Sequence, residues 1–243
     1  AVYHGAEGLV RIAQRVNRLT NQLASSLIDS GHEIKCDRFF DTICFKASGW
    51  KEKSEAMKLN FRDFGDGFVG ISLDETTTES DIENILDVFN AKLNPDHSKS
   101  IPDNLVRGSR FLSNSVFTKY RSETEMLRYM HKLELKDLSL NTSMIPLGSC
   151  TMKLNATTEM KPVTWPEFSN VHPFAPTNQV GGYHTLINEL GDRLIQLTGF
   201  DAISMQPNSG AQGEYAGLMT IRAFHKANNQ QERDICLIPS SAH

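Results

Sequence analysis

Apolar residues recur at helical spacing from the start of the chain. Between residues 7 and 28 they line one face of an amphipathic helix, and a second such face covers residues 82–89. Gly31 follows the first pattern and supplies the left-handed residue that commonly ends a helix. Residues 76–78 offer a start for the second helix, because threonines are favoured N-caps. The pattern therefore predicts two amphipathic helices in this part of the chain.

Strand-like patterns lie between these helices. Residues 34–47 are rich in β-formers, and residues 68–73 form a second apolar run after the glycine turn at 65–67. A short helix is expected around residues 52–59. Because helix and strand alternate in this way, residues 1–95 are predicted to form a small α/β domain.

The middle of the chain loses this periodicity. Residues 96–112 are polar and aperiodic, and they are predicted to be a linker. Ser122 and Glu125 form a plausible capping box for the helix that follows. Residues 144–176 are irregular, but their clustered aromatic side chains favour an ordered segment.

Helical and strand-like patterns return after residue 182. A helix is followed by a strand at residues 202–205, a glycine-containing loop, a helix at 215–227 and a strand at 235–238. This order is typical of the opening of a parallel α/β layer. Two strands do not make a stable parallel sheet, which needs more partners and cover on both faces. The chain is therefore expected to be an internal piece of a longer polypeptide.

Composition narrows the class of protein. The net charge of −4 argues against nucleic acid as a partner. No apolar run approaches the roughly 20 residues that cross a bilayer, so no membrane contact is expected. The scattered cysteines predict neither a disulfide scaffold nor a metal site, and they fit a reducing compartment: Cys36, Cys44, Cys150 and Cys236.

The loop at residues 206–214 (QPNSGAQGE) is the strongest chemical signal. A turn of small residues from a strand into a helix directs several backbone N–H groups at one point, and the helix dipole adds positive potential there. A phosphate group fits such a turn. The alternative is a tight turn with a purely steric role.

Three segments in this order closely resemble the glycine decarboxylase family, the P-protein of the glycine cleavage system. They are residues 144–155 (MIPLGSCTMKLN), residues 206–214 and residues 237–243 (LIPSSAH). Shorter matches cover nearly the whole chain: 122–130 (SETEMLRYM), 165–168 (WPEF) with 172–174 (HPF), and 40–42 (FDT) with 70–76 (GISLDET). The order and length of these motifs identify the chain as similar to part of that family.

The resemblance implies an incomplete fold of the pyridoxal-phosphate-dependent, aminotransferase-like type (fold type I). Residues 1–95 would be the small α/β domain that closes the N-terminal half, and residues 96–112 the linker. Residues 113–243 would begin the second, cofactor-binding large α/β domain.

The resemblance also implies an activity. Enzymes of this family are oxidoreductases that act on a CH–NH2 group with a disulfide as acceptor. They release CO2 from glycine in glycine catabolism and transfer the aminomethyl group to the lipoyl arm of H-protein. The implied partners are glycine, lipoylated H-protein, the remainder of the chain itself and further copies in a homo-oligomer. The compartment would be the cytoplasm in a bacterium or the mitochondrial matrix in a eukaryote.

Candidate site residues follow from the matched motifs. The resemblance places the cofactor phosphate at Ser209, Gly210, Ala211 and Gln212 and stacks His243 on the cofactor ring. Substrate contacts are expected from Ser149, Thr151 and His172, although each is nearly as well explained as a structural residue. No catalytic residue is assigned, because the Schiff-base lysine of the family lies downstream of residue 243 and Lys153 does not match it.

Two predictions follow about the chain by itself. It is expected to be inactive in glycine decarboxylation, because the Schiff-base lysine is missing. The alternative function is a non-catalytic module that binds a phosphate-bearing ligand or a partner subunit.

Overall fold

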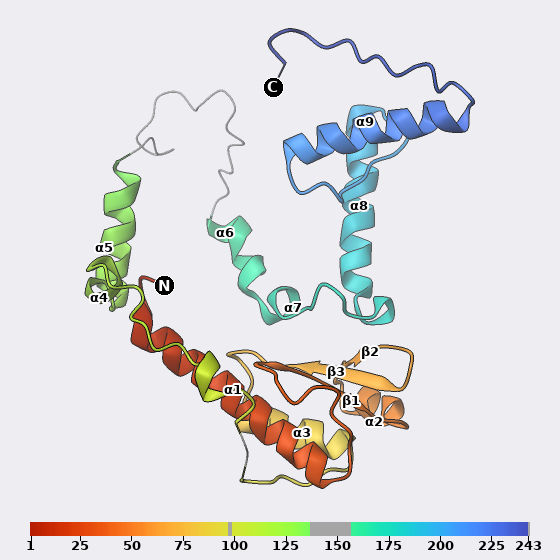
Figure 1. The fold of residues 1–243 in the computed structure, drawn as a ribbon. Helices are drawn as coiled ribbons and strands as arrows, with labels where there is room; N and C mark the ends of the chain where they lie inside the picture. The colour runs from red at the N-terminus through yellow and green to blue at the C-terminus, as the bar shows by residue number, and fades with distance from the viewer. Residues whose placement is uncertain (97–98, 137–156, 243) are drawn as a thin grey trace. The chain divides into compact units, whose positions relative to one another are not determined.

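A computed structural model describes residues 1–96, 99–136 and 157–242 of the chain (Figure 1). The chain divides into two units, Ala1–Asn155 and Ala156–His243. Each unit is described by itself. The predicted linker at residues 96–112 remains a prediction, as do the domain boundaries on either side of it.

Helix α1 (Gly5–Asp29) opens the first unit and confirms the first helical pattern. Its end has the predicted left-handed glycine, since Gly31 has a φ of +90°. The N–H of Gly31 donates to the oxygen of Ile28 at 2.9 Å, and the N–H of His32 donates to Leu27 at 3.0 Å. These two bonds form a Schellman motif, which satisfies carbonyl groups that the helix leaves open.

Three antiparallel strands follow, in the spatial order β1-β3-β2. They are β1 (Thr42–Lys46), β2 (Arg62–Asp63) and β3 (Phe68–Ser72), and the short helix α2 (Lys51–Ala56) follows β1. The strand expected over residues 34–47 forms only in its last third. Its earlier part contacts the sheet through an isolated bridge between Ile34 and Phe45. The strand is therefore shorter than the run of β-forming residues in the sequence.

Helix α3 (Glu79–Val88) completes this α/β piece. Thr78 is its N-cap: the Thr78 hydroxyl accepts the N–H of Asp81, and the Asp81 carboxylate accepts the N–H of Thr78. This reciprocal capping box satisfies two donors at the helix start, which is why the helix begins among the predicted threonines.

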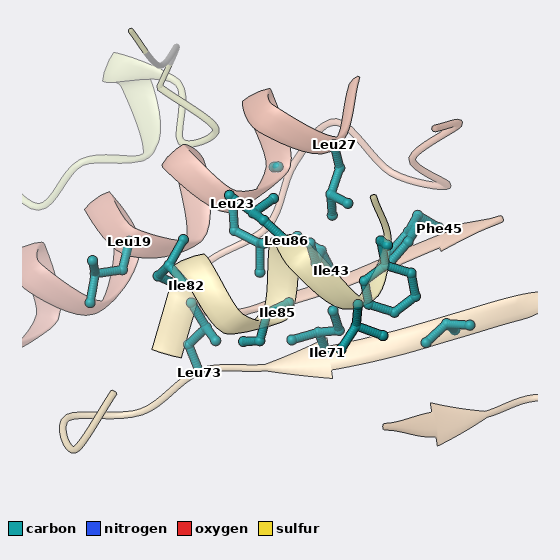
Figure 2. Close-up of a cluster of buried hydrophobic side chains, with 14 of the residues drawn as sticks. Leu19, Leu23, Leu27, Ile43, Phe45, Ile71, Leu73, Ile82, Ile85 and Leu86 are labelled. Atoms are coloured by element: carbon teal, nitrogen blue, oxygen red, sulfur yellow. The ribbon is translucent and has the colours of Figure 1, made fainter. Parts of the chain in front are cut away.

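Helices α1 and α3 pack on the face of the sheet that carries its buried side chains (Figure 2). Alternation along the strands sends Ile43, Phe45, Val69 and Ile71 to this face, and the register pairs Ile43 with Ile71 and Phe45 with Val69. The helices contribute the rest of the core: Leu19, Leu23, Ala24, Leu27, Ile82, Ile85, Leu86, Val88 and Phe89, with Trp50 and Leu73. The predicted small α/β piece therefore has one hydrophobic core.

The loop that joins β3 to α3 carries a hydrogen-bonded carboxylate, Asp74. The Asp74 carboxylate accepts the hydroxyl of Thr76 at 2.7 Å, its N–H at 2.9 Å and the N–H of Thr77 at 3.2 Å. These bonds, from the Thr76 hydroxyl first, hold the pKa of Asp74 below its ordinary value. Asp74 therefore stabilises the folded unit above the pKa of the unfolded carboxyl, and this contribution is lost as pH falls through the lower, folded pKa.

We accordingly expect the unfolding free energy of the first unit to fall as the pH drops below about 4. The Asp74→Asn variant should show a weaker fall, measured by urea unfolding at a series of pH values. Asp37→Asn is the matched control, because within the described residues the Asp37 carboxylate accepts no hydrogen bond. Equal pH profiles for the two variants would contradict this assignment.

The other regular elements that the structure describes in the first unit are helical. They are the 3-10 turn η1 (Asp103–Leu105), α4 (Val116–Lys119) and α5 (Glu123–Glu134). Ser122 caps α5 as predicted, since its hydroxyl accepts the N–H of Glu125 at 3.3 Å. The Glu125 side chain bonds to the Ser122 hydroxyl and not to its N–H, so only half of the predicted capping box forms.

The described part of the second unit consists of helices joined by irregular segments. Its short elements are α6 (Thr157–Met160), η2 (Lys161–Thr164), α7 (Pro166–Ser169) and η3 (Thr177–Gln179). Two long helices follow, α8 (Gly181–Thr198) and α9 (Gly210–Ala227). The expected helix after residue 182 is thus confirmed. The helix expected from residue 215 is also present, but it begins five residues earlier.

The two strands expected in this unit do not form. Residues 202–205 and 235–238 belong to no helix and no strand, and Leu237 is 93% exposed. A strand is stable only when neighbours take up its backbone N–H and C=O groups, and these two segments do not pair with each other. Within the described residues the sheet is therefore the small antiparallel one, and the predicted start of a parallel layer is not formed.

Candidate functional site

The start of α9 contains the four residues predicted to hold a phosphate. Ser209 is the N-cap, with an extended backbone at φ −153° and ψ 167°. Its hydroxyl oxygen accepts the N–H of Gln212 at 3.3 Å, and its carbonyl accepts the N–H of Gly213 at 3.0 Å. Serine is a favoured N-cap because this side-chain bond satisfies one of the open donors of the first turn. The cap explains why the glycine loop is already helical from Gly210.

A second hydrogen bond closes the turn before the helix. The side-chain oxygen Oε1 of Gln212 accepts the N–H of Asn208 at 2.9 Å. With the oxygen engaged, the Gln212 side-chain NH2 group and the Ser209 O–H remain as donors. Sequence reasoning assigned these two side chains as possible donors and missed their role in shaping the turn.

Two backbone donors of the first turn point out of the helix. The N–H groups of Gly210 and Ala211 precede the first intrahelical bond, and no hydrogen bond among the described residues engages them. A Cβ placed on Gly210 would meet nothing within 4 Å, so the approach to these groups is open. The α9 dipole adds positive potential at this end. The donor set fits an anionic phosphate group.

The predicted substrate residue His172 lies elsewhere in this unit. It is exposed, and its Nδ1 accepts the N–H of Phe174 at 3.0 Å. The two rings are 5.9 Å apart. The alternative to a pocket residue was a packed core residue that is hydrogen-bonded to the backbone. The backbone hydrogen bond is present, but the side chain is exposed. The described contacts do not bring His172 to the start of α9, and its role in binding substrate stays a prediction.

The aromatic cluster around His172 is divided into two groups. Phe168 contacts Trp165 at 6.3 Å and Tyr183 at 5.8 Å between ring centroids. The Tyr183 hydroxyl also donates to the carbonyl of Phe168 at 2.7 Å, which fixes α7 against the start of α8. The aromatic side chains stay exposed, with Trp165 at 46% and Phe174 at 89%. Residues 144–156 lie outside the described residues, so the expected order of the whole irregular segment stays a prediction.

Three other predicted site residues, Ser149, Thr151 and His243, lie outside the described residues, as does Cys150. Within the described ranges, no group of histidine, cysteine and acidic residues has the arrangement of a metal site. None of the described helices is both long and apolar enough to cross a membrane.

Two cavities among the described residues of the first unit are lined by other residues. One of about 490 Å³ is lined by residues that include Trp50, Lys51 and Asp63. The hydrogen bond from Lys51, with a further one from the N–H of Gly65, holds the pKa of Asp63 below its ordinary value. The other, of about 320 Å³, includes His32 and Asn21. Neither brings together residues that the sequence assigned to chemistry.

Known proteins match the chain over its whole length. Residues 1–89 match the family described as Glycine cleavage system P-protein. The chain is 51% identical to glycine dehydrogenase (decarboxylating) of Enterobacter sp. (strain 638) and of Klebsiella pneumoniae (strain 342), and 50% identical to that of Salmonella paratyphi B. Each alignment covers 100% of this chain and 27% of the relative, so the chain spans about a quarter of the length of these relatives.

The resemblance drawn from the sequence motifs is thereby confirmed. The chain is homologous over its full length to part of an enzyme, glycine dehydrogenase (decarboxylating), and its first 89 residues match a glycine cleavage system family.

Proposed function

We propose that this chain is part of a pyridoxal-phosphate-dependent glycine decarboxylase. One observation carries the proposal: the Ser209-capped start of α9, where the N–H groups of Gly210 and Ala211 are open to an anion. The 51% identity to glycine dehydrogenase (decarboxylating) supports the assignment of this anion as the cofactor phosphate. The fold proposed for the longer protein is the aminotransferase-like type, in which further strands pair with residues 202–205 and 235–238.

The residues of this chain would bind and orient the cofactor. Gly210 and Ala211 donate their N–H groups to the phosphate, and Ser209 and Gln212 add an O–H and an NH2 donor. When bound, pyridoxal phosphate supplies an electron sink for the decarboxylation of glycine. Serine at the cap also keeps the first turn rigid, so the donors are held in place before the ligand arrives.

The segment after α9 has the right length to return to this site. The 18 residues of α9 span about 27 Å at 1.5 Å per residue. The ten residues 234–243 span about 33 Å when extended. A strand that follows a helix in an α/β layer runs back along it. We therefore assign His243 to the cofactor ring, on the same side as the phosphate donors.

The remaining contacts come from the segments that the motifs matched. We assign Ser149 and Thr151 to the glycine carboxylate or the incoming lipoyl arm, and His172 to the wall of the same pocket. Lipoylated H-protein is the proposed acceptor of the aminomethyl group, and the longer protein is proposed to form a homo-oligomer.

Cofactor binding tests the proposal without any catalytic step. The probe is 4′-deoxypyridoxine phosphate, which lacks the aldehyde and so forms no Schiff base with surface lysines. We expect it to bind the 243-residue chain at least about tenfold more tightly than 4′-deoxypyridoxine, because charge-assisted hydrogen bonds to the phosphate contribute about 1.5–3 kcal/mol each. Equal affinity of the two compounds, measured by calorimetry, would refute the phosphate site.

The chain by itself is expected to be inactive. Supplied with pyridoxal phosphate and lipoylated H-protein, it should exchange no label between carbonate and the carboxyl group of glycine. The reason is that no lysine of the chain matches the Schiff-base lysine of the family. A glycine decarboxylase of full length is the positive control in the same assay, and measurable exchange by the chain would contradict the prediction.

A further inference from the structure

A tight turn closes the C-terminal end of α9. Asn229 has a left-handed backbone with φ +57°. Its N–H donates to the oxygen of Lys226 at 3.2 Å, and the N–H of Gln230 donates to that of His225 at 2.9 Å. This pair of bonds is a second Schellman motif, with asparagine in the place that glycine usually takes. The chain reverses direction here.

Two side chains of α9 hold the residues that follow this turn. Nη1 of Arg222 donates to the backbone oxygens of Gln231 and Arg233, each at 3.0 Å. Three residues further along the same face, Nδ1 of His225 lies 3.0 Å from the side-chain oxygen of Gln230. Arg222 and His225 are half-buried by these contacts, whereas the helix residues between them are exposed.

The contacts of Arg222 are directed at the main chain. Among the described residues no salt bridge involves Arg222, so its positive charge is used for the two carbonyl groups. Hydrogen bonds from a charged donor are about twice as strong as neutral ones. The guanidinium also lies in the C-terminal half of α9, where the helix dipole favours a cation. Arg222 therefore fixes where the chain leaves the turn.

The two hydrogen bonds of Arg222 set the direction in which the chain leaves the turn after α9. After Arg233 the chain runs back along α9, toward the end of the helix where Gly210 lies (Figure 1). An unanchored chain of about ten residues would have many other paths, and each fixed residue costs about 1–2 kcal/mol of backbone entropy. The two Arg222 hydrogen bonds, called the anchor below, remove part of this entropy cost before any ligand binds.

We propose that Arg222 is a positioning residue, which fixes the turn after α9 so that residues 234–242 return to the phosphate-binding start of the helix. This inference rests on the proposed function, because it assigns the ligand site to Ser209 and its neighbours. Arg222 acts at a distance from the ligand. Its role is to bring the returning residues 234–242 beside the ligand that is bound at the start of α9.

Two ligands separate this role from a general effect on α9. Inorganic phosphate needs only the donors at the helix start, whereas 4′-deoxypyridoxine phosphate also needs a group facing its ring. Arg222→Met should weaken binding of 4′-deoxypyridoxine phosphate about fivefold or more and leave inorganic phosphate unchanged. A fivefold loss of affinity would mean that, in the Arg222→Met variant, the returning segment occupies its binding position about a fifth of the time.

The control uses the same chain. Arg193→Met removes an equal charge from α8, where Arg193 only pairs with Glu189 at 3.8 Å on the surface, and it should change neither affinity. Loss of both ligands in Arg222→Met, or no loss of either, would overturn the inference.

Hydrogen exchange without any ligand tests the anchor separately. The N–H groups of Gln230 and Arg233 are bonded within the turn, to His225 at 2.9 Å and to Gln230 at 3.1 Å. Their exchange should be at least about tenfold faster in Arg222→Met than in Arg193→Met. If the unaltered chain binds neither ligand, the proposed function fails, and hydrogen exchange still tests whether Arg222 fixes the turn. Equal exchange rates in the two variants would show that Arg222 does not fix it.

Discussion

Replacing Phe45 by alanine is expected to lower the unfolding free energy of the first unit by about 3–5 kcal/mol. Phe45 is fully buried in the cluster drawn in Figure 2. Its ring centroid lies 4.8 Å from that of Phe89 and 5.4 Å from that of His32. The loss includes the burial of the ring and the cavity that the core cannot fill. Because whole domains are stable by only about 5–15 kcal/mol, the variant should be close to unfolding.

Urea unfolding measures this loss. Trp50 belongs to the same core and Trp165 to the second unit, so a Trp165→Phe background leaves a single fluorescent reporter. The control is Phe40→Ala in that background, because Phe40 is 43% exposed and should cost about 1 kcal/mol or less. A Phe45→Ala variant as stable as the control would show that the core lies elsewhere.

Replacing Ser209 by aspartate is expected to weaken phosphate binding at least about tenfold while α9 stays intact. Aspartate is as good an N-cap as serine, and its charge is favoured by the helix dipole. It nevertheless puts a carboxylate where the proposed ligand carries its own negative charges. Two unit charges at 4 Å repel by about 4 kcal/mol near a protein surface, which solvent reduces at an exposed site.

Ser209→Asn is the matched control for this experiment. Asparagine caps helices as well as aspartate does but carries no charge, so its affinity should remain near that of the unaltered chain. Both variants are compared by calorimetry with inorganic phosphate, and their helix content is compared by circular dichroism. Similar phosphate binding by the two variants would mean that the anion does not sit at the start of α9.

The elements that the sequence predicted well are those with local determinants. Leu19, Leu23 and Leu27 define the buried face of α1 by spacing alone, and Gly31 ends the helix through its own backbone preference. The threonines before α3 act in the same way, since capping involves only neighbouring residues. These features need no distant partner, so a sequence pattern is enough to find them.

The predictions that were wrong concern elements that depend on distant partners. Residues 202–205 and 235–238 have strand-like composition, yet no neighbouring strand among the described residues takes up their backbone groups. The early start of α9 was missed because the cap Ser209 was read as part of a loop. Arg222 was missed for a third reason: its partners are main-chain oxygens, and these carry no sequence signal.

The most direct test of the phosphate site is a titration of the 15N-labelled chain with inorganic phosphate, followed by NMR at single amides. We expect saturable shifts at Gly210 and Ala211, whose N–H groups are open, and smaller changes at Gln212, whose N–H is already bonded to Ser209. The Ser209→Asp chain should show none of them. Unmoved amides at Gly210 and Ala211, with shifts elsewhere in the chain, would rule out a phosphate site at the start of α9.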